Sequence, residues 1–235
     1  MDWMDRLALF SPLDAVAVAL LMVSWLLIGL LVENPPKNHP SVSVLMAQYR
    51  REWMVQMVPR DPRIFDAQIL SSLRQGTAFF GSATMIAIGG CLALFGNMER
   101  FIGVASDLTL DSDPTIVWEA KVLVLLIFLA NAFLKFVWSN RLFGYCAVLM
   151  AAVPNEADHP KSMPRARKAG EINITAAKGF NRGLRSIYFA LASTVWLLGA
   201  GALIGAVIFT CLVLLRREFA SHSRAVLLQA ENAEG

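Results

Sequence analysis

The chain has 235 residues, of which 56% are apolar and 17% are Asp, Glu, Lys or Arg, and its formal net charge is +3. A soluble domain carries roughly a quarter charged residues, so this balance argues against a soluble domain and indicates an integral membrane protein. The three cysteines lie within or beside apolar runs without metal-ligand spacing, which indicates small packing residues.

Four apolar segments are long enough to cross a bilayer as helices. They run over about 13–32, 70–96, 117–150 and 187–215. At ~1.5 Å per residue, about 20 residues cross a ~30 Å hydrocarbon core, and a helix satisfies its own backbone there. The first segment lacks the basic start and cleavage site of a signal peptide, so we expect it to be retained. The sequence thus predicts an all-α integral membrane four-helix bundle, with residues 1–235 forming a single membrane domain.

Between the first two spans, residues 41–58 form a shorter amphipathic segment. Its apolar residues recur three and four positions apart, which is the period of one helix face. They are Val42, Leu45, Met46, Tyr49, Trp53 and Met57. Because the segment is too short and too charged to span, we predict an interfacial helix in the headgroup region.

The connecting segments differ in charge. Residues 33–66 and the loop at about 151–186 are basic, whereas the loop at 97–116 is acidic. By the positive-inside rule, the basic segments face the cytoplasm, and four spans then place both termini outside. The C-terminal tail, 216–235, departs from this pattern, because it begins with Arg216 and Arg217 on the outer side. Within the basic loop, the part from about Ala169 is predicted to be helical and to run into the fourth span.

Lys135 lies inside the third predicted span, six residues or ~9 Å before Arg141. Its side chain either extends back to the headgroups or faces the bundle with a partner or a bound anion. Other polar residues reach the same depth and predict a basic collar, with Asp66 and Glu52 as candidate counter-charges. The candidate anion, lipid or partner site comprises Arg51, Arg74, Asn131, Lys135, Arg141, Arg182 and Arg185. The predicted interface anchors are Trp53, Trp118, Lys121 and Trp138.

Small residues form stripes on two of the predicted spans, and such stripes let helices approach closely. They are Ser82, Gly89, Ala93 and Gly96 in the second span, and Gly201 and Gly205 in the fourth. We expect both stripes to be used within the bundle, with a homodimer through the fourth span as the alternative. No phosphate-binding loop, zinc-protease or nucleophile-elbow motif is present, and no histidine pair lies in a span. The sequence therefore predicts no catalytic residue, no metal, no cofactor and no nucleic-acid partner.

Several strings taken together resemble the membrane proteins collected as domain of unknown function 599, over nearly the whole chain. They are "YRREWM" (49–54), "AFFGSATMIAIGG" (78–90), "WEAKVLVLLIFLANAFLKFVWSNR" (118–141), "FNRGLRSIYFALA" (180–192) and "LLRREFASHSRAVL" (214–227). The resemblance implies a multi-span protein of the plasma membrane, here a bacterial inner membrane, and supplies no activity. It places these residues in motif positions: Arg51, Trp53, Lys121, Lys135, Trp138, Arg141, Asn181, Arg182, Arg185, Arg217 and Glu218. The family pattern A-F-F-K-F-T-W reads "AFLKFVW" here, so Val137 lacks the threonine hydroxyl near Lys135.

We expect a non-enzymatic membrane component whose cytoplasmic basic face binds anionic lipid headgroups or a membrane partner, including another copy of the chain. The alternative is a small oligomeric transporter or channel for an anionic solute, with Asn131, Lys135 and Arg74 along its path. The two differ at Lys135, which faces a hydrated cavity in a transporter. In a binding component it reaches the headgroups or forms an ion pair.

Overall fold

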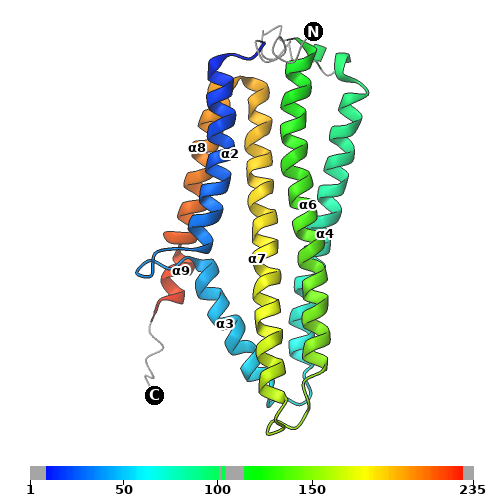
Figure 1. The fold of residues 1–235 in the computed structure, drawn as a ribbon, viewed down its shortest axis with the longest axis vertical. Coiled ribbons are helices and arrows are strands. Elements are labelled where there is room, and N and C mark those ends of the chain that lie inside the picture. Colours follow the sequence, from blue (N-terminus) through cyan, green and yellow to red (C-terminus); the bar gives the residue numbers. More distant parts are fainter. Residues whose placement is uncertain (1–8, 101, 104–113, 230–235) are drawn as a thin grey trace. The chain divides into compact units, whose positions relative to one another are not determined.

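The computed structural model describes residues 9–100, 102–103 and 114–229, and this part of the chain contains helices and turns but no β-strand. The long helices are α2 (Pro12–Glu33), α4 (Ile64–Phe95), α6 (Thr115–Ala151), α7 (Ser162–Thr194) and α8 (Ala200–Phe219) (Figure 1). Shorter helices are α3 (Val42–Met57) and α9 (His222–Leu227). Four segments are long and apolar enough to cross a membrane: Pro12–Glu33, Ile64–Phe95, Thr115–Ala151 and Ala200–Leu227. The predicted all-α class with four such helices is confirmed.

Local sequence signals set the ends of α2 and the start of α3. Ser11 and Asp14 cap α2 reciprocally, because each side chain accepts a hydrogen bond from the other residue's backbone N–H. After Glu33, two consecutive prolines prevent the helix from continuing. Ser41 then caps α3, and its hydroxyl donates to the carbonyl of Val32 at 2.7 Å. The end of α2 and the start of α3 are therefore held together directly.

The prediction of one helical span over 187–215 is wrong. Helix α7 ends at Thr194, a 3₁₀ turn follows over Val195–Leu198, and α8 begins at Ala200. Between them Gly199 has φ 107°, a backbone conformation that glycine adopts without steric cost. The chain reverses there, so that it runs along α7 and returns along α8 (Figure 1).

Most of the predicted loop at 151–186 is also helical, because α7 is 33 residues long and begins at Ser162. Pro164 falls in its first turn, where no backbone N–H is required for an intrahelical bond. Most of the predicted acidic loop, and the end of the C-terminal tail, lie outside the described residues.

The sequence predicts a single domain, and the chain packs as two compact units. We call the first the spanning unit; it comprises Met1–Leu27, Phe79–Phe136 and Arg182–Cys211. We call the second the basic unit; it comprises Ile28–Ala78, Val137–Asn181 and Leu212–Gly235. Most of the 21 Lys and Arg residues belong to the basic unit.

In the spanning unit, α2 and α8 run in the same direction. Near the start of α2, Asp14 accepts a hydrogen bond of 2.7 Å from Trp196 Nε1, just before α8 begins. Further along α2, Ser24 is hydrogen-bonded to Cys211 of α8. Helices α2 and α8 therefore end on the same side of the bundle.

The part of α7 in the spanning unit is largely buried, and it packs against α6. Phe189 is fully buried and stacks on Phe128 of α6, with ring centroids 6.2 Å apart. A Cβ on Gly183 would lie 2.6 Å from Phe136, so only glycine permits this approach. Outward-facing residues of α4 are apolar instead, with Ile86 76% exposed. Within the spanning unit, the enclosed helix is thus α7, which is the least apolar one.

The two small-residue stripes are not used for this packing, contrary to expectation. Gly201 and Gly205 are exposed, and a Cβ at either position would meet no atom within 4 Å. Ser82, Gly89 and Ala93 on α4, and Gly96 just after it, are exposed as well.

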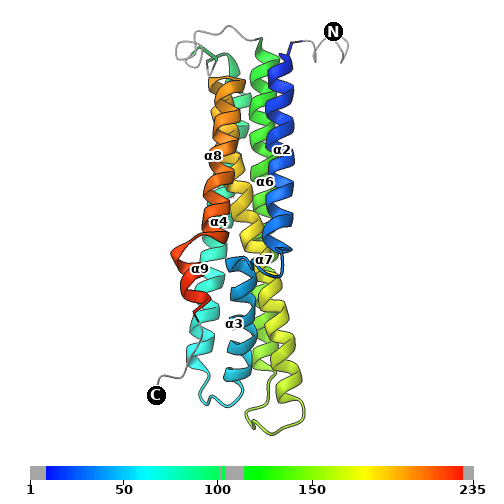
Figure 2. The same ribbon diagram turned by 90° about the vertical axis from the view of Figure 1, so that its left-hand side faces the viewer.

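The core of the basic unit joins α3 to α4, α6 and α7. Its buried residues are Met54, Met57, Val58, Leu70, Leu142, Phe143, Cys146, Met150, Val153, Ala166, Ala169 and Ala176. Met54 of α3 packs closely on Gly170 of α7, where a Cβ would lie 3.4 Å from the methionine Cγ. The predicted helix at 41–58 is thus present, and part of its apolar face packs against protein. The short helix α9 lies beside α3 (Figure 2).

Candidate functional site

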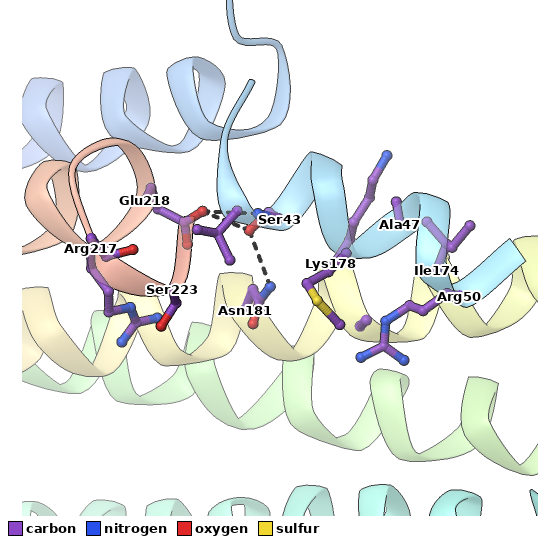
Figure 3. A pocket seen from close by; sticks show the side chains of 13 residues that line it. Ser43, Ala47, Arg50, Ile174, Lys178, Asn181, Arg217, Glu218 and Ser223 are labelled. Carbon is purple, nitrogen blue, oxygen red and sulfur yellow. Dashed lines mark hydrogen bonds between the residues drawn. The ribbon is translucent and has the colours of Figure 1, made fainter. Parts of the chain in front are cut away.

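The basic unit contains a cavity of about 310 Å³ between α3, α7 and the junction of α8 with α9 (Figure 3). Three cationic side chains and one carboxylate contribute to its wall, together with several hydroxyl groups and one amide. The lining residues are Val42, Ser43, Met46, Ala47, Arg50, Ile174, Ala177, Lys178, Asn181, Arg217, Glu218, Ser221 and Ser223. We call this space the α3–α7–α8 cavity.

Arg50 is the partly buried cation of this cavity. Its guanidinium donates to the side-chain oxygen of Asn173, which is itself fully buried on α7. Among the described residues, no carboxylate forms an ion pair with Arg50. Burial accordingly lowers the pKa of the Arg50 guanidinium from its ordinary value, because the charge is desolvated without a neutralising partner. A desolvated guanidinium with a neutral partner is well suited to bind an incoming anion.

Glu218 is held at the first turn of α3. Its Oε2 accepts hydrogen bonds from the backbone N–H and the hydroxyl of Ser43, at 3.1 and 3.0 Å. Asn181 Nδ2 reaches the same hydroxyl at 3.5 Å (Figure 3). A carboxylate at a helix N-terminus also interacts favourably with the helix dipole. Glu218 thus fixes the end of α8 against α3 and forms one side of the cavity.

Two exposed cations complete the lining. Lys178 belongs to α7, and Arg217 comes from the last turn of α8, next to Glu218. Figure 3 shows the Arg217 side chain extending towards Ser223. With Arg50, these groups carry three positive charges against one negative charge, so the cavity has a net positive lining.

Helix α9 and the segment before α3 close one side of this region. Arg224 donates from Nε to the carbonyl of Pro40 at 2.9 Å, and its Nη2 lies 3.2 Å from His39 Nδ1. The His39 ring stacks on Phe219, with centroids 5.7 Å apart. These contacts set the position of Ser221 and Ser223, which flank the start of α9.

The predicted site residues of the basic unit do not enter this cavity. Arg51 is exposed and forms an ion pair with Glu171 at 2.6 Å, and this hydrogen bond raises the pKa of Arg51. Arg141 is exposed and contacts Tyr145 one turn along its own helix, with a hydrogen bond of 2.6 Å. Each of these arginines therefore has a local partner on the surface.

Arg74 lies elsewhere in the basic unit, in a wider groove of about 670 Å³ between α4 and α6. Its side chain is exposed, and Gln75 of α4 and Asn140 of α6 also line the groove. Arg63 also lines this groove, but it donates to the carbonyls of Val153 and Pro154 at 2.7 and 2.8 Å. Arg63 therefore fixes the chain after α6.

Four predicted site residues belong to the spanning unit and not to the basic unit. Asn131 donates to the hydroxyl of Ser186 at 2.6 Å, which joins α6 to α7. Lys135 is half-buried, and no hydrogen bond or ion pair to it occurs among the residues described. Arg185 is buried on α7, whereas Arg182 is exposed. The residues of the predicted collar are therefore divided between the two units.

The interface anchors need correction. Trp118 and Lys121 are buried, at 1% and 5% exposure, and the Lys121 ammonium lies 4.6 Å from the Trp118 ring centroid. They stabilise the interior of the spanning unit and do not face its surroundings. Trp53 donates to Asp66 at 2.7 Å, and Asp66 is the counter-charge of Arg60. Trp138 is 52% exposed.

Sequence reasoning missed Arg50 and Lys178. A signal for Arg50 was available, because Ala47 and Met54 lie three positions before and four after it, and both are buried. A helix face drawn through these two residues includes Arg50 and excludes Arg51. Lys178 lies in the part from about Ala169 that was predicted to be helical, but no pattern there distinguished it from the other cations. Asn181, Arg217 and Glu218 fell in motif positions without a role.

Comparison with known proteins gives a family and no activity. The family model described as protein of unknown function, DUF599, matches residues 16–223. No curated protein and no solved structure matches the chain. The matched segment includes all of the α3–α7–α8 cavity. On this match the chain belongs to the DUF599 family.

Proposed function

We propose that the protein is a non-enzymatic membrane component that binds the phosphate of an anionic lipid headgroup in the α3–α7–α8 cavity. The observation that carries this proposal is Arg50, a partly buried arginine that lines the cavity and whose hydrogen-bond partner, among the residues described, is a neutral amide. Phosphate suits such a site because its oxygens accept several hydrogen bonds from guanidinium, ammonium and hydroxyl groups. Lys178 and Ser221 place two such donors in the same wall.

The lengths of the helices support a location beside the headgroups. Helix α4 has 32 residues and α6 has 37, so they are about 48 and 55 Å long. A hydrocarbon core is only ~30 Å thick, so about 20 Å of each helix extends beyond it. The basic unit contains one end of each of these helices, with Arg74 on α4 and Arg141 on α6, and most of the other Lys and Arg residues of the chain. This charge favours the cytoplasmic leaflet by the positive-inside rule and attracts anionic lipid.

The alternative, transport of an anionic solute, has less support. Asn131 is engaged with Ser186, and neither Asn131 nor Lys135 lines the α3–α7–α8 cavity or the groove at Arg74. The proposed path residues therefore share no cavity that the basic unit contains.

The test is lipid retention by the full chain in nanodiscs made of phosphatidylcholine with a minor share of phosphatidylglycerol. Native mass spectrometry counts the lipids that stay bound. We expect Arg50→Gln to reduce bound phosphatidylglycerol about tenfold, equivalent to ~1.4 kcal/mol. The matched control is Arg216→Gln, because Arg216 is exposed, adjacent in sequence to Arg217 and absent from the cavity lining.

Equal retention by Arg50→Gln and Arg216→Gln would contradict the proposal, provided that both variants unfold at the wild-type temperature. Solute flux through the reconstituted wild-type protein, lost in Lys135→Met, would instead support the transport alternative.

A further inference from the structure

The groove at Arg74, between α4 and α6 in the basic unit, has the dimensions of a second binding site. We call this space of about 670 Å³ the α4–α6 groove. Small side chains on both helices leave room for it, among them Ala67 and Ser71 on α4 and Ala147 and Ala151 on α6. Small-molecule sites in proteins commonly enclose roughly 300–1,000 Å³. The α4–α6 groove can therefore hold a small molecule.

The floor of the α4–α6 groove is apolar. Met57, Leu70 and Met150 line it, and all three are buried members of the core of the basic unit. Methionine side chains are flexible and polarizable, so they adapt to the shape of an apolar partner. An aliphatic chain that entered the groove would pack on these three side chains.

Arg74 is the cation that the α4–α6 groove offers to a ligand. The lining contains two arginines and no carboxylate. The Nη groups of Arg63 donate to three backbone carbonyls, and its Nε is buried. Arg74 is exposed, and within the described chain no hydrogen bond or ion pair engages its side chain. A guanidinium in this situation can pair with a carboxylate through two parallel hydrogen bonds.

Two amides accompany Arg74 in the lining. Gln75 comes from α4 and Asn140 from α6, and neither side chain has a hydrogen-bond partner in the part of the chain that the structure describes. Amide N–H₂ groups donate to an anion without adding charge. The α3–α7–α8 cavity has three cations in its wall, whereas the α4–α6 groove thus suits a ligand with a single negative charge.

The position of the groove along α4 favours a single-chain ligand over a membrane phospholipid. Residues 76–95 of α4 contain no charged side chain, and at ~1.5 Å per residue this run covers a ~30 Å hydrocarbon core. Leu70, on the apolar floor, precedes the run by ~9 Å. A phospholipid whose chains stay in the bilayer would bring only its headgroup into the groove and leave the floor uncovered. A single-chain amphiphile can leave the bilayer and lay its chain on the floor.

We infer that the α4–α6 groove binds a long-chain carboxylate, that is, a fatty acid. Its carboxylate accepts hydrogen bonds from Arg74, Gln75 and Asn140. Its chain packs on Leu70 and Met150. The inference goes beyond the proposed function, because it concerns a different space and a different class of anion.

The test is photolabelling of the full chain in phosphatidylcholine nanodiscs. The probe is a fatty acid with a photoreactive diazirine near the end of its chain, and its methyl ester is the uncharged control. Peptide mass spectrometry locates the labelled residues. We expect the acid to label the floor, at Leu70 or Met150, about tenfold more than the ester does, because only the acid forms a charge-assisted pair with Arg74.

Two pairs of variants test the two halves of the ligand. Arg74→Gln should lower labelling by the acid about tenfold, to the level of the ester. Its matched control is Arg141→Gln, since Arg141 is exposed on α6 and does not line the groove. Ala67→Leu should block the chain by filling the groove, whereas Gln68→Leu adds the same side chain at a neighbouring exposed position outside the lining. Thermal unfolding within a few degrees of wild type shows that each variant keeps the fold.

The inference is wrong if the ester labels the floor as strongly as the acid, or if either variant of the groove behaves like its control. Competition with unlabelled dodecanoate and with short-chain phosphatidylglycerol distinguishes the two classes of anion. Displacement by dodecanoate alone supports the inference, whereas equal displacement by phosphatidylglycerol shows a headgroup site and contradicts it. Arg50→Gln should leave the labelling unchanged, so a failure of this test and a failure of the phosphate site in the α3–α7–α8 cavity are distinguishable.

Discussion

The spanning unit buries several polar side chains and exposes apolar ones, whereas the basic unit exposes most of its charges around an apolar core. In the spanning unit, Arg185 and Ser186 are buried while Ile86 and Phe79 face outward. In the basic unit, Arg51 and Lys168 face outward while Met54 and Phe143 are buried. The same chain thus follows opposite rules in its two parts, as expected for lipid around one and water around the other.

The comparison is sharpest along α7, because one continuous helix takes part in both units. Its first part presents Arg167 and Lys168 to the surroundings, whereas its last part turns Arg185 inward. Helix α7 is not among the four segments apolar enough to span. This difference shows that a helix surrounded by other helices can remain polar at the depth of the bilayer, because only lipid-facing positions must be apolar.

The largest expected effect is on topology, where the result is all or none. In a background without the native cysteines, Thr115→Cys, Asn38→Cys and His222→Cys are labelled in intact cells with a membrane-impermeant maleimide. Because α8 runs in the same direction as α2, positions 38 and 222 should share one side, and position 115 should lie on the other. If positions 222 and 115 were labelled from the same side, this topology would be contradicted, and a bundle in which α7 does not cross the membrane would be supported.

The next largest effect concerns the contact of α7 with α6 in the spanning unit. Gly183→Leu should destabilise the protein by about 3 kcal/mol, because even a Cβ would overlap the Phe136 ring. Thermal unfolding in detergent, followed by tryptophan fluorescence, measures the loss. Gly201→Leu is the control, since its surroundings are open, and it should unfold close to wild type. Equal behaviour of the two variants would mean that α7 does not pack on α6 this closely.

In the basic unit, the buried carboxylate of Asp66 should have an intermediate effect. Asp66→Ala removes the acceptor for Trp53 Nε1 and the partner of Arg60, and should cost about 2 kcal/mol. Glu52→Ala, at an exposed position of α3, should cost less than about 0.5 kcal/mol. The same unfolding assay applies, and a wild-type midpoint for Asp66→Ala would show that α3 is not fixed to α4 by this pair.

The smallest effect is expected for the surface ion pair of the basic unit. Arg51→Gln should cost about 0.5 kcal/mol, because Arg51 and Glu171 are more than half exposed and the pair is screened by salt. A double-mutant cycle with Glu171→Gln, measured at low and at 1 M salt, isolates this term. A coupling energy that does not fall in high salt would indicate that the pair is shielded from solvent. Retention of phosphatidylglycerol should be unchanged, since Arg51 does not line the cavity.

Hydropathy predicted α2, α4 and α6, because each contains an apolar run long enough to cross a bilayer with few charged residues. It failed at the break between α7 and α8, because the turn lies inside one apolar run, "VWLLGAGALIGA", and only Gly199 marks it. The charge pattern contained evidence for this turn. Arg216 and Arg217 conflicted with a four-span map, and the reversal at Gly199 places them in the basic unit with the other cations.

The sequence predicted a group of cations on the basic face, but it named other residues than those that line the α3–α7–α8 cavity. An anion site on the basic face was expected, but Arg51 was favoured where its neighbour Arg50 lines the cavity. The choice between adjacent arginines depends on which helix face is buried, and Tyr49 and Trp53 suggested a different face from Ala47 and Met54. Glu218 and Lys178 join Arg50 only through tertiary packing of α7 and α8 on α3, which no local pattern records.

The turn at Gly199 also bears on how the protein is made. Helix α7 contributes Arg182 and Arg185 to the spanning unit. A segment this polar does not readily insert into lipid by itself. The glycine turn joins it to α8, which is apolar enough to enter. We therefore expect the two to leave the translocation machinery as a hairpin, after the ribosome has completed α8. A nascent chain arrested before Gly199 should still hold α7 outside the bilayer.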